Sequence, residues 1–551
     1  MNKIIENFIL TIHKNKNIFP AEYAFYEFPY QLQIGSNSQI TWYSNEQYLF
    51  ILYGEVTNFK ELAKENHFSL ESNFSIIISL FEKYGMRFFD ELRGRYAIIL
   101  IDKTKCCAYI SKDYIGTKAL YYFESNEAIY ITSHARNLNF LTSVNRNYIK
   151  KVLDGERIYG TETAFDGVKC VPSGEVMLLV ETRKIYFHKL NYNIPTIRYR
   201  KKSEYYEHFC ELLQKILNKN INTNVAFTIS GGLDCTLLSH IFSRASKQQI
   251  QAYTFDLSSY GKSSEEIYIR DIEKNREINI NYVDLKDKFL ENIITKNYDE
   301  PNHYILTNAW DIMLNQCKGE AVSSLVTGFG GDEITVGYEH IDNSEYIKQK
   351  AERSFLSMNE KKLHLYTNSN ILHSGQIYYS NVKIPPNINS SYVKIYNRLF
   401  SGEIGRLIYR YEQDCFEKTD IKFILPFLER DIIEFSLGIP VDVHADKGMT
   451  KKLQRKAGCN LIPKSIEKRK DKSDFFHWYI IELLKQYDFV EDLISNSIVL
   501  NENYGANNII EIVRAFYAES NMNYLCRKEQ ANKILDFIAV ELWLKKLKSG
   551  K

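Results

Sequence analysis

Two glycine-rich segments carry the residue types best suited to chemistry in this sequence. The first follows the apolar run NVAFTIS and opens a helical pattern, and it is Ser230-Gly231-Gly232-Leu233-Asp234-Cys235-Thr236. Adjacent glycines let the backbone approach an anion, and a helix start offers unpaired N–H groups and a positive dipole end. Asp234 adds the hard oxygen ligand that magnesium prefers. The segment predicts a site for pyrophosphate and Mg²⁺, the alternative being a simple turn.

The second segment comes after another apolar stretch, AVSSLV, and it is Thr327-Gly328-Phe329-Gly330-Gly331-Asp332-Glu333. Asp332 would provide a second acidic ligand for the same metal ion. The alternative is a glycine-rich surface turn. Two acids on separate glycine loops fit a site that surrounds a triphosphate, so we expect both loops to contribute to one nucleotide site.

The type of nucleotide chemistry follows from which motif is present. A P-loop requires G-x-x-x-x-G-K-[ST] and a dinucleotide fold requires G-x-G-x-x-G, and neither pattern occurs at the first turn. The segment 230–236 instead resembles the PP-loop of ATP pyrophosphatases, which cleave ATP between the α and β phosphates. That resemblance implies ATP as cofactor and transfer of AMP.

The surrounding elements predict an α/β protein of two domains. Short β-type runs such as YLFILYGEV, RYAIILID and CCAYISKD predict a sheet-rich first domain with one helix over SNFSIIISLFEKYG. A polar, basic segment at 191–202 marks the boundary. Alternating helices and strands follow it, which predicts a parallel sheet, and the chain from about residue 361 has mostly helical patterns. We therefore expect domains at 1–190 and 203–551.

Composition excludes several classes of protein. Lys plus Arg number 70 and Asp plus Glu 68, so the net charge of +2 gives no broad surface for nucleic acid. No run approaches the length of a membrane span or resembles a cleaved signal. The 9 cysteines have neither zinc-type spacing nor the density of a disulfide scaffold, which predicts reduced thiols and a cytoplasmic location.

With both loops and the domain order in view, the chain resembles the asparagine synthetase family, which includes β-lactam synthetases and lasso peptide cyclases. GEVTNFKEL (54–62) is similar to the family's GEIYNYKEL, and SKDYIGTKALYY (111–122) to ARDRFGIKPLYY. FEKYGMRFFDELRGRYAIILIDKTK (81–105) lies between them in family order. PFLE (426–429) resembles PFLD, and TKKLQRKA (450–457) resembles a K-x-x-L-R helix. The resemblance implies an Ntn-type, glutaminase-like first domain and an ATP-pyrophosphatase second domain.

The resemblance also implies a catalytic lysine near the end of the chain. The basic segment Lys468-Arg469-Lys470-Asp471-Lys472-Ser473-Asp474-Phe475 is similar to the family's segment ending in K-x-x-F, which places that role on Lys472. An ammonium there would balance negative charge as the amine attacks and the leaving group departs. The alternative for Lys468 and Lys470 is a solvated helix end.

Several positions depart from the family pattern. The chain begins with Met1 and Asn2 rather than the nucleophilic cysteine, and the first cysteine, Cys106, falls in an expected strand, so we expect no glutamine hydrolysis. Phe329 replaces the glutamate of asparagine synthetases and the tyrosine of β-lactam synthetases, and a phenyl ring cannot accept a proton. Cys235 replaces a serine, a loss for which Thr236 could compensate. Glu429 stands for aspartate, and Lys422 for a frequent glutamate.

These departures favour an amine that belongs to a larger substrate. The expected activity is ATP-dependent ligation of a carboxylate to an amine through an acyl-adenylate, with closure of a macrolactam or isopeptide bond in a lasso-type peptide. A precursor peptide and a leader peptidase would be its partners. The alternatives are an asparagine synthetase, a β-lactam synthetase-like enzyme acting on a small amino acid, or a scaffold that only binds nucleotide.

Overall fold

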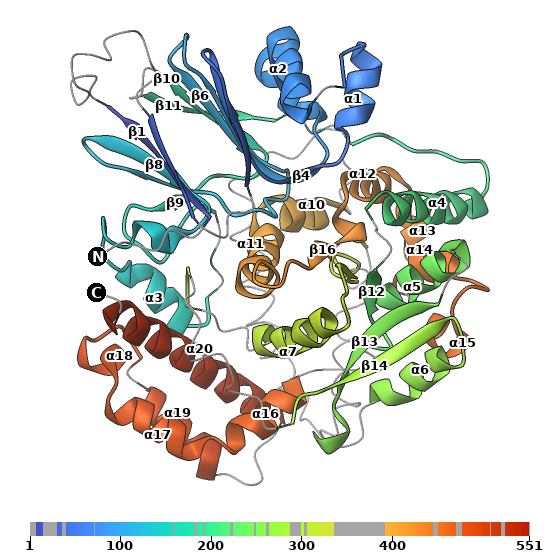
Figure 1. Cartoon of the computed structure of the whole chain (residues 1–551). Helices are drawn as coiled ribbons and strands as arrows, with labels where there is room; N and C mark the ends of the chain where they lie inside the picture. The colour runs from blue at the N-terminus through green and yellow to red at the C-terminus, as the bar shows by residue number, and fades with distance from the viewer. Residues whose placement is uncertain are drawn as a thin grey trace.

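The chain was analysed as a computed structural model, shown in Figure 1. The structure describes residues 7–14, 30–35, 40–70, 72–156, 158, 160–180, 184–190, 192, 194–220, 224–246, 249–260, 264–286, 299–301, 306–335, 392–444, 450–469, 476–506, 508–518 and 524–549. No helix within these ranges is long and apolar enough to cross a membrane.

The first domain is built from two antiparallel sheets. One has the strand order β2-β1-β8-β7-β9 and the other β11-β10-β6-β5-β4-β3. The strands are β1 (Phe8–His13), β2 (Tyr30–Ile34), β3 (Ile40–Ser44), β4 (Tyr48–Val56), β5 (Gly94–Asp102), β6 (Cys107–Lys112), β7 (Tyr121–Glu124), β8 (Ala128–Thr132), β9 (Lys169–Cys170), β10 (Glu175–Val180) and β11 (Lys184–Lys189).

Strand β4 explains why the sheets form layers. Its side chains alternate between the two faces: Leu49 and Ile51 pack into the core between the sheets, whereas Phe50 and Leu52 pack against helices. Those helices, α1 (Phe59–Asn66) and α2 (Asn73–Tyr84), cover the outer face of this sheet (Figure 1). Because both faces of β4 are buried, its sequence is an almost continuous apolar run.

The second domain contains a fully parallel sheet with the order β14-β13-β12-β15-β16. Helix α7 lies on one side of it and α5 and α6 on the other (Figure 1). The elements are α4 (Lys202–Asn220), β12 (Val225–Thr228), α5 (Leu233–Ser246), β13 (Ile250–Asp256), α6 (Ser264–Glu273), β14 (Ile278–Asp284), α7 (Leu306–Gly319), β15 (Ser324–Val326) and β16 (Lys422–Ile424).

Helices dominate the rest of the described chain, as the sequence predicts from about residue 361. They are α10 (Val393–Phe400), α11 (Glu403–Tyr411), the π-helical η7 (Glu412–Phe416), the 3₁₀ turn η8 (Pro426–Leu428), α12 (Arg430–Gly438), α13 (Val441–His444), α14 (Lys452–Ala457), α15 (Lys464–Glu467), α16 (Phe476–Leu484), α17 (Tyr487–Ser495), α18 (Ile498–Asn501), α19 (Ile509–Ala518) and α20 (Tyr524–Ser549). Earlier in the chain lie helix α3 (Arg146–Leu153) and the 3₁₀ turns η3 (Gly85–Glu91), η4 (Ala135–Leu138) and η5 (Ser258–Tyr260).

Two expectations about single elements need correction. The sequence predicts Cys106 within a strand, but β6 begins at Cys107, and Cys106 lies in the preceding turn with φ of 54°. The chain reverses direction there between β5 and β6, and the left-handed residue belongs to that reversal. The mostly helical last third also contains β16, a strand of three residues that only its pairing with β15 identifies.

Candidate active site at the carboxyl edge of the parallel sheet

The two glycine loops meet because their strands are neighbours. β12 pairs with β15 in parallel, so the loops that follow them leave the same edge of the sheet. From β12 the strand order runs in two opposite directions: β13 and β14 lie on one side of β12, and β15 and β16 lie on the other side. Such a change of direction opens a crevice at the carboxyl ends of parallel strands, where ligands bind in open α/β sheets.

The glycines in these loops are required by contact between the loops. A Cβ atom at Gly331 would lie 2.4 Å from Cγ of Asp234, and one at Gly328 would lie 2.7 Å from Sγ of Cys235. Either addition would force the loops apart. The glycines therefore let the second loop pack directly on the acid of the first.

One lysine links the two aspartates. Nζ of Lys451 forms an ion pair with Oδ2 of Asp234 and lies 2.7 Å from Oδ1 of Asp332. Lys451 is only 7% exposed. Burial opposes its charge, but the two carboxylates outweigh burial and raise the pKa of Lys451 above its ordinary value. The ammonium therefore stays charged between the two acids.

The backbone of Lys451 is held in an uncommon conformation. Its φ of 55° and ψ of 38° are left-handed, and it is the residue before helix α14. One turn further on, the side-chain amide of Gln454 donates a hydrogen bond to the backbone carbonyl of Gly331 at 2.9 Å. A non-glycine residue in this region is often part of a functional site. Helix α14 thus fixes both the lysine and the second glycine loop.

Sequence reasoning assigns Lys451 no role. The segment 450–457 stands out only for its resemblance to a family helix, and nothing local distinguishes Lys451 from Lys452 or Lys456. The one signal that could have found it is the first position of the K-x-x-L-R pattern. Its partners are far away in the chain, so only the tertiary structure selects this lysine from its neighbours.

A second cation contacts the first loop. Nη1 of Arg469 donates to the carbonyl of Gly231 at 2.8 Å, and its guanidinium lies 4.1 Å from the ring centroid of Tyr268. Gly231 has φ of 65°, and a Cβ there would lie 2.9 Å from the Tyr268 Cβ. Arg469 ends the described part of the basic segment. Lys472, to which the resemblance assigns catalysis, lies outside the described residues.

The other predicted phosphate contacts have different surroundings. Ser230 is exposed at the loop. Thr236 is fully buried, and its hydroxyl donates at 2.6 Å to the carbonyl of Gly232, the residue before helix α5. Burial raises the pKa of the Cys235 thiol, which lies 3.5 Å from the Thr228 hydroxyl. Thr236 is therefore turned into helix α5 in this structure, whereas Ser230 is accessible.

Phe329 belongs to an aromatic cluster. Its ring centroid lies 5.3 Å from Tyr411, and 6.0 Å from both Trp310 and Phe423. The ring is partly buried, and it brings no proton acceptor to the second glycine loop. Its neighbours come from α7, α11 and β16, so the cluster forms an aromatic wall beside the glycine loop.

The donor set fits the predicted magnesium ion. Asp234 and Asp332 offer carboxylate oxygens, and one lysine charge leaves their combined charge negative. Within the described residues no group of three or more His, Cys, Asp or Glu side chains could enclose a metal. Magnesium does not require one, because it commonly binds through one or two carboxylates together with substrate phosphates.

The family follows from comparison with known proteins. Residues 210–545 match the asparagine synthase family, and residues 34–191 match the glutamine amidotransferase domain. Both glycine loops, Lys451 and Arg469 lie within the first match. The chain therefore belongs to the asparagine synthase family, whose members are ATP-dependent ligases that form amide bonds. The expected order, an Ntn-type sheet domain followed by a parallel-sheet α/β domain, is confirmed.

Individual relatives are distant. The chain is 21% identical to asparagine synthetase 1 of Bacillus subtilis over 80% of this chain and 77% of that protein. It is 24% identical to a putative glutamine-hydrolysing asparagine synthetase of Methanocaldococcus jannaschii, over 53% of this chain. The match spans only 59% of that relative's length.

Solved structures overlap weakly. An NH₃-dependent NAD synthetase from Campylobacter jejuni matches 37% of this chain and 96% of its own, with 14% identity and a TM-score of 0.22. A glutamine phosphoribosylpyrophosphate amidotransferase from B. subtilis matches 52% of this chain and 63% of its own, with 11% identity and a TM-score of 0.21. Superpositions this poor support no functional conclusion.

Proposed function

We propose that this protein activates a carboxylate as an acyl-adenylate and transfers the acyl group to an amine, releasing AMP and pyrophosphate. The observation that carries the proposal is the meeting of Asp234 and Asp332 around Lys451 at the carboxyl edge of the parallel sheet. The site combines acids for magnesium, glycine loops for phosphate, and a buried cation.

The chemistry takes place in two steps. A substrate carboxylate oxygen attacks the α phosphorus of ATP, and the bond from that phosphorus to the bridging oxygen breaks, so pyrophosphate leaves. The amine nitrogen then attacks the acyl carbon, the bond from carbon to the AMP oxygen breaks, and the amine loses a proton. Magnesium held by Asp234 and Asp332 would neutralise phosphate charge, and Lys451 supplies a further positive charge beside them.

Lys472 remains a proposed partner in this site. It follows Arg469 by three residues, and Arg469 is bound to the Gly231 carbonyl. Three residues of extended chain span about 10 Å, so the basic segment starts within reach of the pyrophosphate loop. A second ammonium there would add to the charge stabilisation that Lys451 gives.

We further propose that the substrate is a peptide in which an Asp or Glu side chain is joined to the N-terminal amine, as in lasso-type macrolactams. Phe329 supports this proposal. The phenyl ring, packed against Tyr411 and Phe423, supplies no proton acceptor where asparagine synthetases carry a glutamate. A tethered amine needs less help from the enzyme, because orientation alone can supply much of the barrier reduction. A precursor peptide and a leader peptidase would then be partners.

A second candidate is an asparagine synthetase that takes its nitrogen from glutamine or ammonia. The match of residues 34–191 to a glutamine amidotransferase domain favours it, as does the similarity to named asparagine synthetases. The two candidate functions differ in the amine and in the acyl substrate, but both proceed through an acyl-adenylate intermediate.

Isotope transfer tests the proposal. The enzyme is incubated with ATP, Mg²⁺ and a candidate substrate carrying ¹⁸O in its carboxylate, and AMP is analysed by mass spectrometry. One ¹⁸O atom in AMP for each amide formed supports an acyl-adenylate. ADP and orthophosphate as direct products would disprove it. Parallel reactions with a precursor peptide, and with aspartate plus ¹⁵N-glutamine or ammonia, separate the two candidates.

A further inference from the structure

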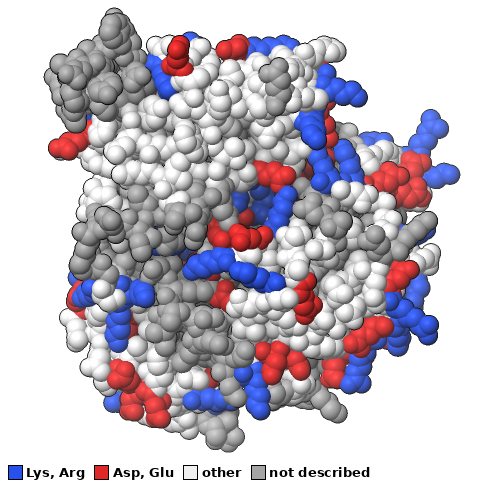
Figure 2. All heavy atoms as spheres, viewed as in Figure 1, with Lys and Arg blue, Asp and Glu red and all other residues white. Residues whose placement is uncertain are grey.

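A charged cavity of about 330 Å³ lies between the two domains. Its walls come from β4, β5 and the segment after β6 in the first domain, and from η7, β16 and the residue before α12 in the second. Figure 2 shows a hollow near the middle of one face, in which Lys and Arg atoms lie between Asp and Glu atoms. Phe423 of the aromatic wall forms part of its lining, so the cavity and Phe329 lie against the same wall.

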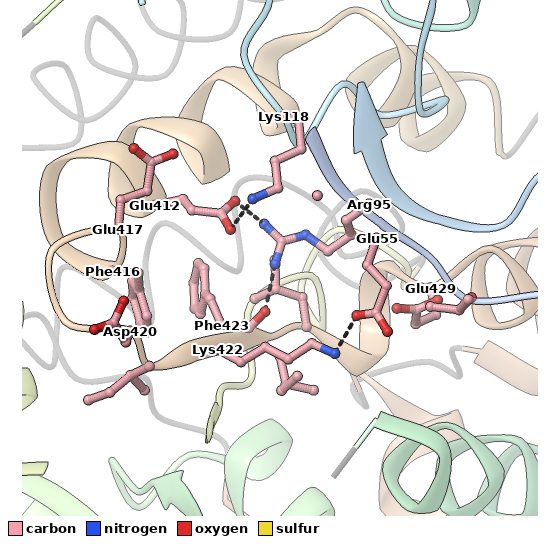
Figure 3. A pocket seen from close by; sticks show the side chains of 15 residues that line it. Glu55, Arg95, Lys118, Glu412, Phe416, Glu417, Asp420, Lys422, Phe423 and Glu429 are labelled. Atoms are coloured by element: carbon pink, nitrogen blue, oxygen red, sulfur yellow. Dashed lines mark hydrogen bonds and ion pairs between the residues drawn. The ribbon is translucent and has the colours of Figure 1, made fainter. Parts of the chain in front are cut away.

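Most charges in this cavity are paired with each other. Glu412 accepts from Lys118 at 2.5 Å and from Arg95 at 2.6 Å, and Arg95 also donates to the Phe423 carbonyl at 2.6 Å. At the more exposed part of the lining, Glu55 forms an ion pair with Lys422 (Figure 3). These pairs engage every cation that lines the cavity.

Of the acids in the lining, Glu429 and the exposed Asp420 have no such pair in the described part of the chain, and Glu429 is the less exposed of the two. It precedes helix α12 but makes no capping hydrogen bond, and within the described ranges it has neither a hydrogen bond nor an ion pair through its carboxyl. Figure 3 shows its side chain next to that of Glu55, with no dashed line reaching it. An acid in this position, only partly exposed and unpaired, is costly unless a cation compensates it.

The whole lining favours a positive ligand. Its cationic side chains are Arg95, Lys118 and Lys422, and its acids are Glu55, Glu412, Glu417, Asp420 and Glu429, which is three positive groups against five negative ones. The remaining wall includes apolar side chains, among them Phe416, Ile421 and Leu425. A bare metal ion would need more unpaired oxygen ligands than Glu429 and Asp420 offer. A cation attached to a short carbon chain matches both parts of the wall.

We infer that this interdomain cavity binds an organic ammonium group, with Glu429 as its counterion. The volume suits a small amine or the first residue of a peptide, since ligand pockets start at about 300 Å³. The inference concerns a site separate from the glycine loops and does not require the proposed ligase activity. The same chemistry could come from a free amine or from a peptide N-terminus.

Calorimetry on the full chain at pH 8 tests the inference, with n-butylammonium as probe and 1-butanol and butyrate as its neutral and anionic counterparts. Saturable binding of butylammonium, at least tenfold tighter than that of either counterpart, supports it. Comparable binding of all three, or of none, would overturn it. This comparison uses the unmodified protein and so does not depend on how any variant folds.

Two variants then locate the site. Glu429→Gln keeps the shape and removes the charge, and it should weaken butylammonium binding at least tenfold. Asp420→Asn removes a charge from an exposed acid lining the same cavity, and it should change binding by less than about threefold. Equal binding by Glu429→Gln and the natural protein would refute the role of Glu429. Alanyl-alanine amide and its N-acetyl form, added in the same way, distinguish a peptide N-terminus from a free amine.

Discussion

Nζ of Lys451 lies 2.7 Å from Oδ1 of Asp332, and the same ammonium is paired with Asp234. One side chain from the helical part of the second domain therefore connects the two glycine loops that follow β12 and β15. Without nucleotide, the lysine holds together two acids that would otherwise repel each other. This arrangement leads to predictions about the stability of the protein and its rate of AMP release.

Replacing Lys451 should destabilise the protein in the absence of metal. Lys451→Met leaves two partly buried carboxylates facing each other, which we expect to lower the free energy of unfolding by about 2 kcal/mol. Millimolar Mg²⁺ should restore part of the loss, because it binds the same acids. Urea denaturation with and without Mg²⁺ measures both effects. Lys456→Met, on the exposed side of the same helix, should change stability by less than about 0.5 kcal/mol.

Adding a methyl group at Gly331 should disrupt the site without disrupting the fold. In Gly331→Ala the new Cβ would meet Cγ of Asp234 at 2.4 Å, so the acid must move. Displacements of about 1 Å can cost a hundredfold in rate, and we expect AMP release to fall at least tenfold. Gly319→Ala is the matched control, since nothing lies within 4 Å of its Cβ. Equal rates in the two variants would contradict the contact.

Replacing either aspartate should affect adenylate formation more strongly than replacing Lys472. Asp234→Ala and Asp332→Ala each remove a magnesium ligand, so adenylate formation should fall by orders of magnitude. Lys472→Ala leaves both acids in place and removes one positive charge, an effect typically worth about 3 kcal/mol or about a hundredfold in rate. AMP release and ATP affinity are measured separately. Near-normal turnover of Lys472→Ala would show that this lysine is dispensable.

Stability should depend on pH through Glu429. Burial raises its pKa from 4.5 to about 7, with Glu55 adding to the rise and Arg95, Lys219 and Lys422 opposing it. An acid with a raised pKa binds more protons when folded, so its contribution is full below about pH 4.5 and is lost as the pH rises through about 7. The loss is at most about 3 kcal/mol.

Glu429→Gln cannot titrate, so it should gain stability relative to the natural protein between about pH 5 and about pH 8. Denaturation curves at several pH values measure this difference. Asp420→Asn serves as the control and should follow the natural protein across the same range. A constant difference between Glu429→Gln and the natural protein would show that Glu429 does not titrate there.

The sequence by itself determined the elements and the class of chemistry. The apolar run of β4, the helix over residues 73–84 and the strand–glycine–helix order at residues 225–246 are local patterns, and the structure has them. The motifs at 230–236 and 327–333 indicated an acid beside glycine in each loop, because close backbone approach is encoded locally by residue type. Family resemblance supplied the order of the two domains.

Only the tertiary structure decided which residues meet. Lys451 resembles its neighbours in sequence, and the left-handed conformation before α14 is what aims it at both acids. Strand β16 is too short for any periodic pattern and exists because β15 offers it an edge. The unpaired state of Glu429 likewise depends on side chains from both domains. Such contacts join residues far apart in the chain, and their energies depend on burial and distance, which no local pattern records.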